Sequence, residues 1–262
     1  MSWLVIEDPG PWGRDALSES RIPAPAADAL QRLADGLRAR VQLVRRHDRT
    51  SSVHSRQVIW AVADHDHAAL HDLGSHDDQT LAELDVTQRA TTAAPVYLVC
   101  THARRDACCA VFGRPLVAAL SAATDRPVWE TSHTGGHRFA GVVIVLPWGL
   151  TYGRVDPDEV ARLVAATDGR EVYLPRYRGR SCDPPAAQVA DVAVRQHTGV
   201  LGIDLVRATV VRATDEEALV SVDAAGRTHN VALAIATPQQ QRPLSCGDAD
   251  APIMAWQVRE IR

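Results

Sequence analysis

Between Pro95 and Pro147 the chain alternates short, β-rich apolar runs with one longer apolar stretch of helical character. The expected elements, in order, are a strand over 95–100, a helix over about 108–123, a strand near 128–130 and a buried strand over 141–147. A strand that returns to the same sheet through a helix runs parallel to its neighbour. The pattern therefore predicts an α/β layer fold with its central strands buried.

The segments on either side extend this pattern. After a Pro/Gly-rich opening, a helix is expected over about 26–38 and strands over 41–46 and 57–63. The His- and Asp-rich stretch over 64–78 is interpreted as a solvated helix or loop, in preference to a divalent-metal site built on His67 and His71. Helices are expected over 156–166, with Asp156 as N-cap, and over 184–197. From about residue 199 onward the pattern is strand-like, with a hairpin turn at 223–227.

Composition excludes several classes of protein. The 262 residues are 46% hydrophobic with a net charge of −4, which fits a globular protein and disfavours nucleic-acid binding. All 28 basic side chains are arginine, so Schiff-base lysine chemistry is excluded. No apolar run reaches the length of a membrane helix, and the N-terminus does not resemble a signal peptide. We therefore expect a cytoplasmic protein without a membrane partner. Five cysteines, an odd number, favour metal or redox chemistry over a secreted disulfide framework.

Four candidate ligands form two pairs, Cys100 with Cys109 and His133 with His137. Cys100 ends a predicted strand and Cys109 opens a predicted helix, so both thiols are expected at the edge of the sheet where α/β proteins place their sites. The two histidines bracket a Gly-Gly pair, whose backbone freedom allows both rings to face one point. Two thiolates and two imidazoles suit a tetrahedral zinc ion or a 2Fe-2S cluster with histidines on one iron. Spacing alone does not choose between them.

Other polar residues surround the candidate ligands in sequence. Cys108 is a possible alternate ligand, although the two neighbours at a helix start point in different directions and Cys109 is preferred. His102 is expected near the site or on the surface, and Arg105 and Asp106, with Arg104, are candidates for bonding the loop. Cys182 and Cys246 are interpreted as incidental thiols, with Cys182 able to approach the site.

Five stretches of the chain resemble the sucrase/ferredoxin-like family, which includes the fungal actin-patch-distribution proteins. They are PGPWGRDAL, YLVCTHARRDACCAVFGRPL, WETSHTGGHRFAGVVIVLPWGLTYGR, YRGRSC and PLSCG. The resemblance implies a thioredoxin-like ferredoxin with a 2Fe-2S cluster, ligated by Cys100 and Cys109 on one iron and by His133 and His137 on the other. The pattern of elements divides the chain into an N-terminal α/β subdomain (1–92), a middle domain (93–198) and a small β-rich C-terminal region (199–262), and the resemblance implies that the middle domain is the thioredoxin-like ferredoxin.

The leading hypothesis is one-electron transfer, with electrons supplied by a flavoprotein ferredoxin reductase or another redox partner. Two neutral imidazoles in place of two thiolates bring the formal charge of an oxidised centre to about zero instead of about −2, which makes reduction easier. The alternative is a structural or regulatory zinc site made of the same four residues. Thiol-disulfide chemistry between Cys108 and Cys109 is disfavoured because adjacent cysteines close only a strained ring. No pair of carboxylates suggests glycoside hydrolysis, so we expect a non-catalytic carrier without sucrase activity.

Overall fold

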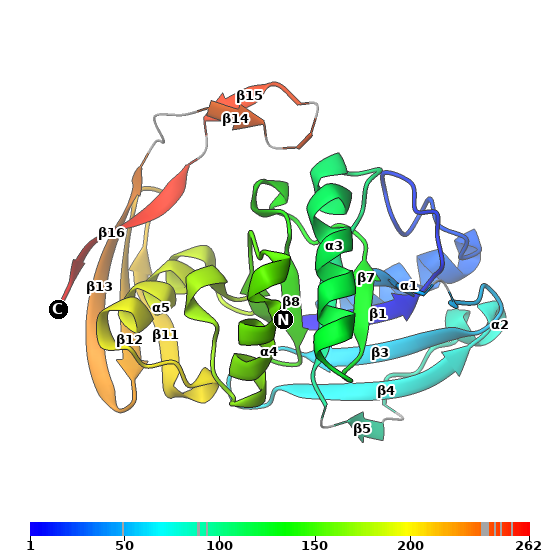
Figure 1. Ribbon diagram of the computed structural model, residues 1–262, viewed down its shortest axis with the longest axis horizontal. Helices are drawn as coiled ribbons and strands as arrows, with labels where there is room; N and C mark the ends of the chain where they lie inside the picture. Colours follow the sequence, from blue (N-terminus) through cyan, green and yellow to red (C-terminus); the bar gives the residue numbers. More distant parts are fainter. Residues whose placement is uncertain are drawn as a thin grey trace.

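The computed structural model describes residues 1–48, 50–87, 90–92, 94–236, 241–243, 245–246, 248–252 and 254–262, with the backbone alone at 90–92, 137 and 242. One ten-stranded mixed sheet runs through the first 180 residues, and a second sheet of four strands follows near the C-terminus (Figure 1). The chain therefore has the mixed α/β architecture expected from the sequence, with a β-rich C-terminal appendage.

The elements alternate along the chain. The strands of the large sheet are β1 (Ser2–Glu7), β2 (Ala39–Arg46), β3 (Arg56–Val62), β4 (Ala69–His76), β5 (Ala90–Thr92), β6 (Val96–Cys100), β7 (Val128–Thr131), β8 (Val143–Leu146), β9 (Leu150–Tyr152) and β10 (Tyr177–Arg180). The helices are α1 (Ala24–Gly36), α2 (Asp78–Ala82), α3 (Ala107–Ala123), α4 (Val160–Asp168) and α5 (Pro185–Thr198), with 3-10 turns η1 (His137–Phe139), η2 (Pro157–Glu159), η3 (Leu174–Arg176) and η4 (Ile203–Leu205).

The middle of the chain forms an α/β unit of four strands with the helices α3 and α4. Strands β6 and β7 are parallel and connected through α3, whereas β8 is antiparallel to β6 and β9 is antiparallel to β8. This gives the order β9-β8-β6-β7, with α4 following β9. The strands alternate their side chains between two cores: Tyr97 and Val99 contact the core under α3 and α4, and Leu98 and Cys100 belong to the opposite core. The alternation places Cys100, the last residue of β6, in a buried position.

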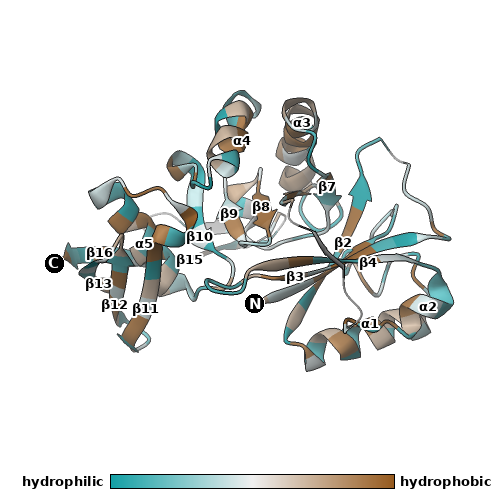
Figure 2. Cartoon of the chain, turned by 90° about the horizontal axis from the view of Figure 1, so that it is seen from below, coloured by the Kyte–Doolittle hydropathy of each residue, from teal (hydrophilic) through white to brown (hydrophobic). Residues whose placement is uncertain are grey.

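The N-terminal half continues the same sheet. Strands β1 and β2 are parallel across α1, β3 and β4 add antiparallel strands, and β2 pairs with β7 to join the two halves. Figure 2 shows α1 and α2 on one side of the large sheet and α3 and α4 on the other. The pairing of β2 with β7 brings residues near position 40 beside residues near position 132.

Two expectations for this half were wrong. The Pro/Gly-rich opening is preceded by β1, whose side chains from Trp3 to Glu7 are all buried. The stretch interpreted as a solvated helix or loop contains β4, because the exposed edge of β3 offers backbone hydrogen bonds and Leu70 fills the core beneath it. Its polar residues, such as Asp72, remain on the exposed side.

The C-terminal part is a separate layer. Strands β11 (Val206–Ala213), β12 (Glu217–Ala224), β13 (Arg227–Ala236) and β16 (Ala255–Ile261) form an antiparallel sheet, and β14 (Gln241–Pro243) pairs with β15 (Asp250–Pro252). Helix α5 covers the sheet, with Ala190 and Val194 against Val220 and Val231. The hairpin turn expected between β12 and β13 is present. The three-part division of the chain into domains stays a prediction.

Within the described ranges, no helix is both long enough and apolar enough to cross a membrane.

Candidate metal centre

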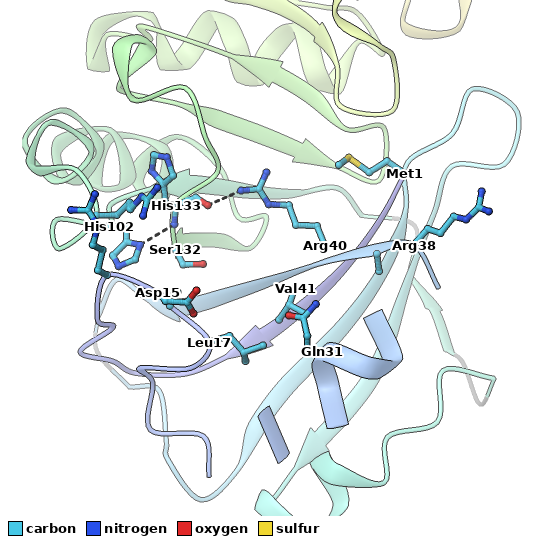
Figure 3. Close-up of a pocket in the computed structure, with 14 residues that line it drawn as sticks. Met1, Asp15, Leu17, Gln31, Arg38, Arg40, Val41, His102, Ser132 and His133 are labelled. Carbon is cyan, nitrogen blue, oxygen red and sulfur yellow. Dashed lines mark hydrogen bonds between the residues drawn. The ribbon is translucent and has the colours of Figure 1, made fainter. Parts of the chain in front are cut away.

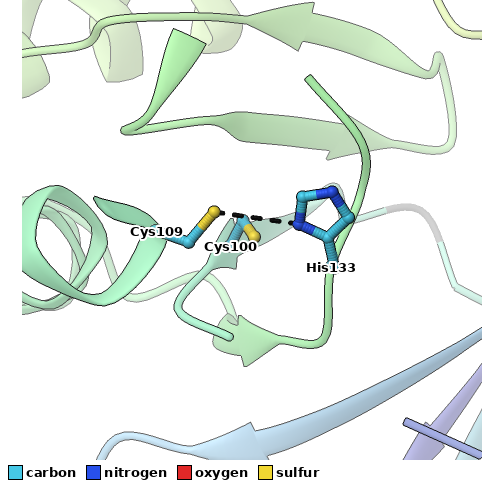
Figure 4. A group of neighbouring side chains, drawn as sticks. All are labelled: Cys100, Cys109 and His133. Carbon is cyan, nitrogen blue, oxygen red and sulfur yellow. Dashed lines mark hydrogen bonds between the residues drawn. The ribbon is translucent and has the colours of Figure 1, made fainter. Parts of the chain in front are cut away.

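Two buried thiols and one imidazole meet where β6, α3 and the loop after β7 come together. Figure 4 shows Cys100, Cys109 and His133 with their sulfur and nitrogen atoms facing one another. One ligand atom from each of the three residues lies within 4.8 Å of the others, and Cys109 Sγ is 3.8 Å from His133 Nδ1. Both cysteines are only 1% exposed. The structure therefore gathers three of the four residues predicted as ligands.

Close contact between α3 and β6 holds the two thiols together. The backbone N–H of Cys109 donates to the carbonyl of Asp106, the residue before α3, and the backbone N–H of Cys100 donates to the carbonyl of Val142, the residue before β8. One turn along α3, Gly113 lies against the end of β6, where an added Cβ would be 2.2 Å from the carbonyl oxygen of Cys100. Any side chain at Gly113 would push the helix away from the strand.

The two cysteines shift each other's pKa in opposite directions. A hydrogen bond from Cys109, helped by His133 and by the backbone N–H groups of His102 and Thr134, holds the pKa of Cys100 well below its usual value in spite of burial. The pKa of Cys109 is raised, first by its bond to Cys100 and then by burial. A buried thiolate surrounded by donors is an arrangement that a bound cation stabilises further.

His102 is buried next to the centre and accepts a hydrogen bond from the backbone of His133. Its Nε2 atom lies 2.6 Å from the carbonyl oxygen of Gly13, and its Nδ1 atom accepts the backbone N–H of His133 at 3.1 Å. Because a carbonyl only accepts and an amide N–H only donates, the ring is neutral with its proton on Nε2. Burial accordingly lowers the pKa of His102, and its ring also packs edge-on against Trp12.

Residues of β2 hold the loop that carries His133. Arg40 donates to the carbonyl oxygens of His133 and Thr134 at 2.7 and 2.9 Å, and Gln42 donates to that of Ser132 at 2.6 Å. Arg40 lines a cleft of about 600 Å³, and Figure 3 shows its side chain reaching the histidine loop. Burial lowers the pKa of Arg40, whereas the nearby thiolate of Cys100 opposes that shift. A positive charge thus lies close to the centre.

The other predicted neighbours take different places. Cys108 is not part of the group of three, and its sulfur lies 3.2 Å from that of Cys246. Asp106 is buried, with one carboxylate oxygen 3.6 Å from His133 Nδ1. Arg105 is half-buried and lines the cleft beside His102 and His133, whereas Arg104 is exposed.

The Gly-Gly turn expected between the two histidines is present. Gly135 and Gly136 both have positive φ, 88° and 67°, a conformation that other residues rarely adopt. His137 then begins η1. Its side chain lies outside the part of the chain that the structure describes, so its role as fourth ligand stays a prediction.

A family model for sucrase/ferredoxin-like proteins matches residues 1–179. The chain belongs to the sucrase/ferredoxin-like family. Among curated relatives of this family member is altered inheritance of mitochondria protein 32 of Debaryomyces hansenii, 38% identical over 93 residues, which are 31% of this chain and 34% of the relative. Its namesake from Candida glabrata is 26% identical over 96 residues, 31% of each chain. The chain thus spans about a third of the length of the curated relatives it matches.

Among solved structures, this sucrase/ferredoxin-like protein is similar to a thioredoxin-like [2Fe-2S] ferredoxin from Aquifex aeolicus. The identity is 20% and the TM-score 0.32, over 36% of this chain and 97% of that one.

Cys182, expected to be incidental or to approach the site, lies in a second group of the sucrase/ferredoxin-like chain. Its sulfur and the polar atoms of His65 and Asp183 are within 4.8 Å of one another. His65 Nε2 lies 2.7 Å from Asp183, and this hydrogen bond, with one to Cys182, raises the pKa of His65 to about 9. The group therefore contains a histidine that is charged at neutral pH and paired with a carboxylate.

Several residues of the centre were not found from the sequence. Arg40 and Gln42 hold the histidine loop from about 90 positions away. Gly13 contacts His102 from a similar distance in sequence, and although it lies in a stretch that resembles the family, nothing in that stretch indicates this contact. The only available signal was the predicted strand over 41–46, which did not show which strand it joins.

Proposed function

We propose that the protein holds a 2Fe-2S cluster and transfers single electrons between redox partners. The observation that carries the proposal is the convergence of Cys100, Cys109 and His133 at one buried point. Cys100 and Cys109 would bind one iron, and His133 and His137 the other. When bound, such a cluster supplies a reversible one-electron couple.

The residues present fit this group. The buried thiols lie together without a disulfide, and Cys100 already has a low pKa, as a thiolate ligand requires. Backbone N–H groups that point at a ligand sulfur are among the features that set the potential of iron-sulfur centres. His102 and Thr134 supply such N–H groups to Cys100. Arg40 adds a positive charge that stabilises the reduced form of the cluster relative to the oxidised form.

We further propose that the electron donor is a flavoprotein reductase that docks through an acidic face. Next to the histidine loop, the guanidinium groups of Arg178, Arg138 and Arg154 lie 3.2, 4.8 and 5.4 Å from the ring centre of Phe139. Burial and repulsion from the other two arginines lower the pKa of Arg178 to about 10. An acidic partner would relieve this repulsion.

An exposed aromatic side chain lies beside these arginines. Phe112 on α3 is 55% exposed and shares a depression of about 610 Å³ with Arg138 and Arg154. Aromatic residues and arginine are enriched at protein interfaces. This surface borders the candidate centre, since Cys108 lines it as well.

We also propose that the protein works in a reducing compartment such as the cytoplasm, which would keep the free thiols of the candidate centre reduced.

The test is anaerobic purification, followed by iron and sulfide analysis, visible absorption and low-temperature EPR of the dithionite-reduced protein. We expect about two irons and two sulfides per chain, and a signal whose histidine coupling changes in His133→Cys and His137→Cys. His54→Ala, in an exposed loop, is the matched control. A colourless protein with stoichiometric zinc, even after anaerobic iron-sulfur reconstitution, would overturn electron transfer in favour of a zinc site.

The docking proposal is tested by measuring reduction rates with a flavoprotein reductase at several salt concentrations. Arg154→Glu should slow reduction and weaken its salt dependence, whereas Arg227→Glu, on the distant β12–β13 hairpin, should leave both unchanged. Equal rates in both variants would contradict docking at this surface.

A further inference from the structure

A second pair of thiols lies outside the four proposed ligands. Cys108, half-buried on the first turn of α3, has its sulfur 3.2 Å from the sulfur of Cys246. The two residues are 138 positions apart, and Cys246 is exposed to solvent. Adjacent Cys108 and Cys109 would close only a strained ring, so Cys246 supplies the partner that local sequence does not.

The contact does not depend on the sulfurs alone. The carboxylate of Asp106 accepts a hydrogen bond from the backbone N–H of Cys246 at 2.5 Å and another from the hydroxyl of Ser245 at 2.6 Å. Asp106 is 1% exposed and lies two positions before Cys108. One buried carboxylate at the start of α3 thereby positions the backbone that carries Cys246.

We propose that Cys108 and Cys246 form a disulfide when the protein meets a low-molecular-weight disulfide as oxidant. The thiolate of Cys246, which solvent can reach, attacks one sulfur of the oxidant and expels a small thiolate. The thiolate of Cys108 then attacks the Cys246 sulfur of this mixed disulfide and expels the second small thiolate. The two protein thiols are oxidised, the oxidant is reduced to two thiols, and the two protons pass to these leaving groups.

Little movement is needed. A disulfide bond is about 2.05 Å long, so the two sulfurs have to approach by about 1 Å. Because they are already in contact, the second step has a high effective concentration. The pair is thus a modification site distinct from Cys100 and Cys109, whose sulfurs face His133.

The disulfide would also affect the candidate centre, an extension that rests on the proposed function. Cys108 precedes Cys109 directly, so the cross-link joins the first turn of α3 to Cys246 and restrains the helix end that carries a proposed ligand. Opening of this helical turn would then be less frequent. A chelator would therefore remove iron several-fold more slowly from the protein with the Cys108–Cys246 disulfide than from the protein with both thiols reduced.

The experiment treats the full-length protein with oxidised glutathione, alkylates free thiols under denaturing conditions and maps disulfides by mass spectrometry without reduction. We expect the Cys108–Cys246 pair to be about ten times more abundant than any other pair, because of its effective concentration. Cys246→Ser should abolish it, whereas Cys182→Ser, which removes a thiol from the other group, should leave it unchanged. Predominant pairing of Cys108 with Cys109, or glutathione retained on Cys246 without cross-linking, would overturn the proposal.

The same mapping on the Cys100→Ser, Cys109→Ser double variant separates this inference from the proposed function. That variant cannot hold the proposed cluster but keeps Cys108 and Cys246, and its far-ultraviolet circular dichroism reports whether it is folded. Formation of the disulfide there would support the modification site even if the wild-type protein lacks iron. A folded double variant in which the pair stays reduced would count against it.

Discussion

His102 accepts the backbone N–H of His133 through Nδ1, while its Nε2 atom contacts the carbonyl oxygen of Gly13. A single buried ring therefore connects the N-terminal loop to the loop that carries a proposed ligand. Its neutral state, which burial favours, is required because a protonated Nδ1 has no lone pair for the amide.

Replacing His102 by leucine should loosen the histidine loop. The change leaves the N–H of His133 and the carbonyl of Gly13 without their partner, and unsatisfied buried groups cost about 1–3 kcal/mol each. Because two groups lose their partner, we expect the free energy of unfolding, measured in urea, to fall by at least about 2 kcal/mol, together with lower metal content after purification. His102→Gln, which can both donate and accept, should retain more of both. Leucine and glutamine variants with wild-type metal content would show that His102 does not position the loop.

The contact between Gly113 and Cys100 provides a second prediction. Gly113→Ala places a methyl group 2.2 Å from the carbonyl oxygen of Cys100, so α3 has to move away from β6. Overpacking of this kind costs about 1–3 kcal/mol, and the displacement should also separate Cys109 from Cys100 and lower metal binding. The measurements are urea unfolding and titration with zinc.

Gly36→Ala is the matched control for this change, since a Cβ at this last residue of α1 would meet no atom within 4 Å. Alanine has a higher helix propensity than glycine, so this variant should be unchanged or more stable by up to about 1 kcal/mol. Equal behaviour of the two alanine variants would contradict tight packing of α3 on β6.

The local half of this centre was predictable from the sequence, and the distant half was not. Cys100 ends a strand and Cys109 lies in the first turn of the helix that follows, so their convergence follows from the order of elements. Arg40 reaches His133 only because β2 pairs with β7, and strand pairing between distant segments has no local signature. The contact of Cys108 with Cys246, 138 positions away, was missed for the same reason.

Secondary structure was mispredicted where composition concealed a strand. Asp72 and Gly74 gave β4 the polarity of a loop, yet the strand forms because it completes the edge of β3. The buried run of β1 was overlooked because the prolines and glycine that follow it dominate the opening of the chain. In both cases the partner strand, not intrinsic propensity, decides the conformation.

Arg40 should influence the reduction potential of the proposed cluster. Its guanidinium group lies close enough to Cys100 for the thiolate to affect the pKa of Arg40. Loss of this positive charge in Arg40→Gln should lower the midpoint potential by on the order of 50 mV, as expected for one charge at an intermediate dielectric. Arg40→Lys should keep most of the wild-type value, and Arg32→Gln on the exposed side of α1 should keep all of it. Spectroelectrochemical titration of the three variants tests this order, and a potential independent of charge at position 40 would contradict it.

The ion pair between His65 and Asp183 should make stability depend on pH. The hydrogen bond to Asp183 is the largest cause of the rise in the pKa of His65 to about 9, compared with 6.5 for an ordinary histidine. Because the folded state binds this proton more tightly, the stabilisation is complete below about pH 6.5 and is lost as the pH rises through about 9. The free energy of unfolding of His65→Asn, measured in urea, should therefore be about 1–3 kcal/mol below that of the wild-type protein at about pH 6. The difference should be much smaller at about pH 9.5.

His67→Asn is the control for His65→Asn, because this neighbouring histidine has a side chain that is 87% exposed. Its free energy of unfolding should follow that of the wild-type protein at every pH, since screening by water weakens an exposed pair. If the difference between wild type and His65→Asn stayed constant from about pH 6 to about pH 9.5, the histidine would not be titrating in this range. The contact with Asp183 would then stabilise the fold through packing or a neutral hydrogen bond, not through charge.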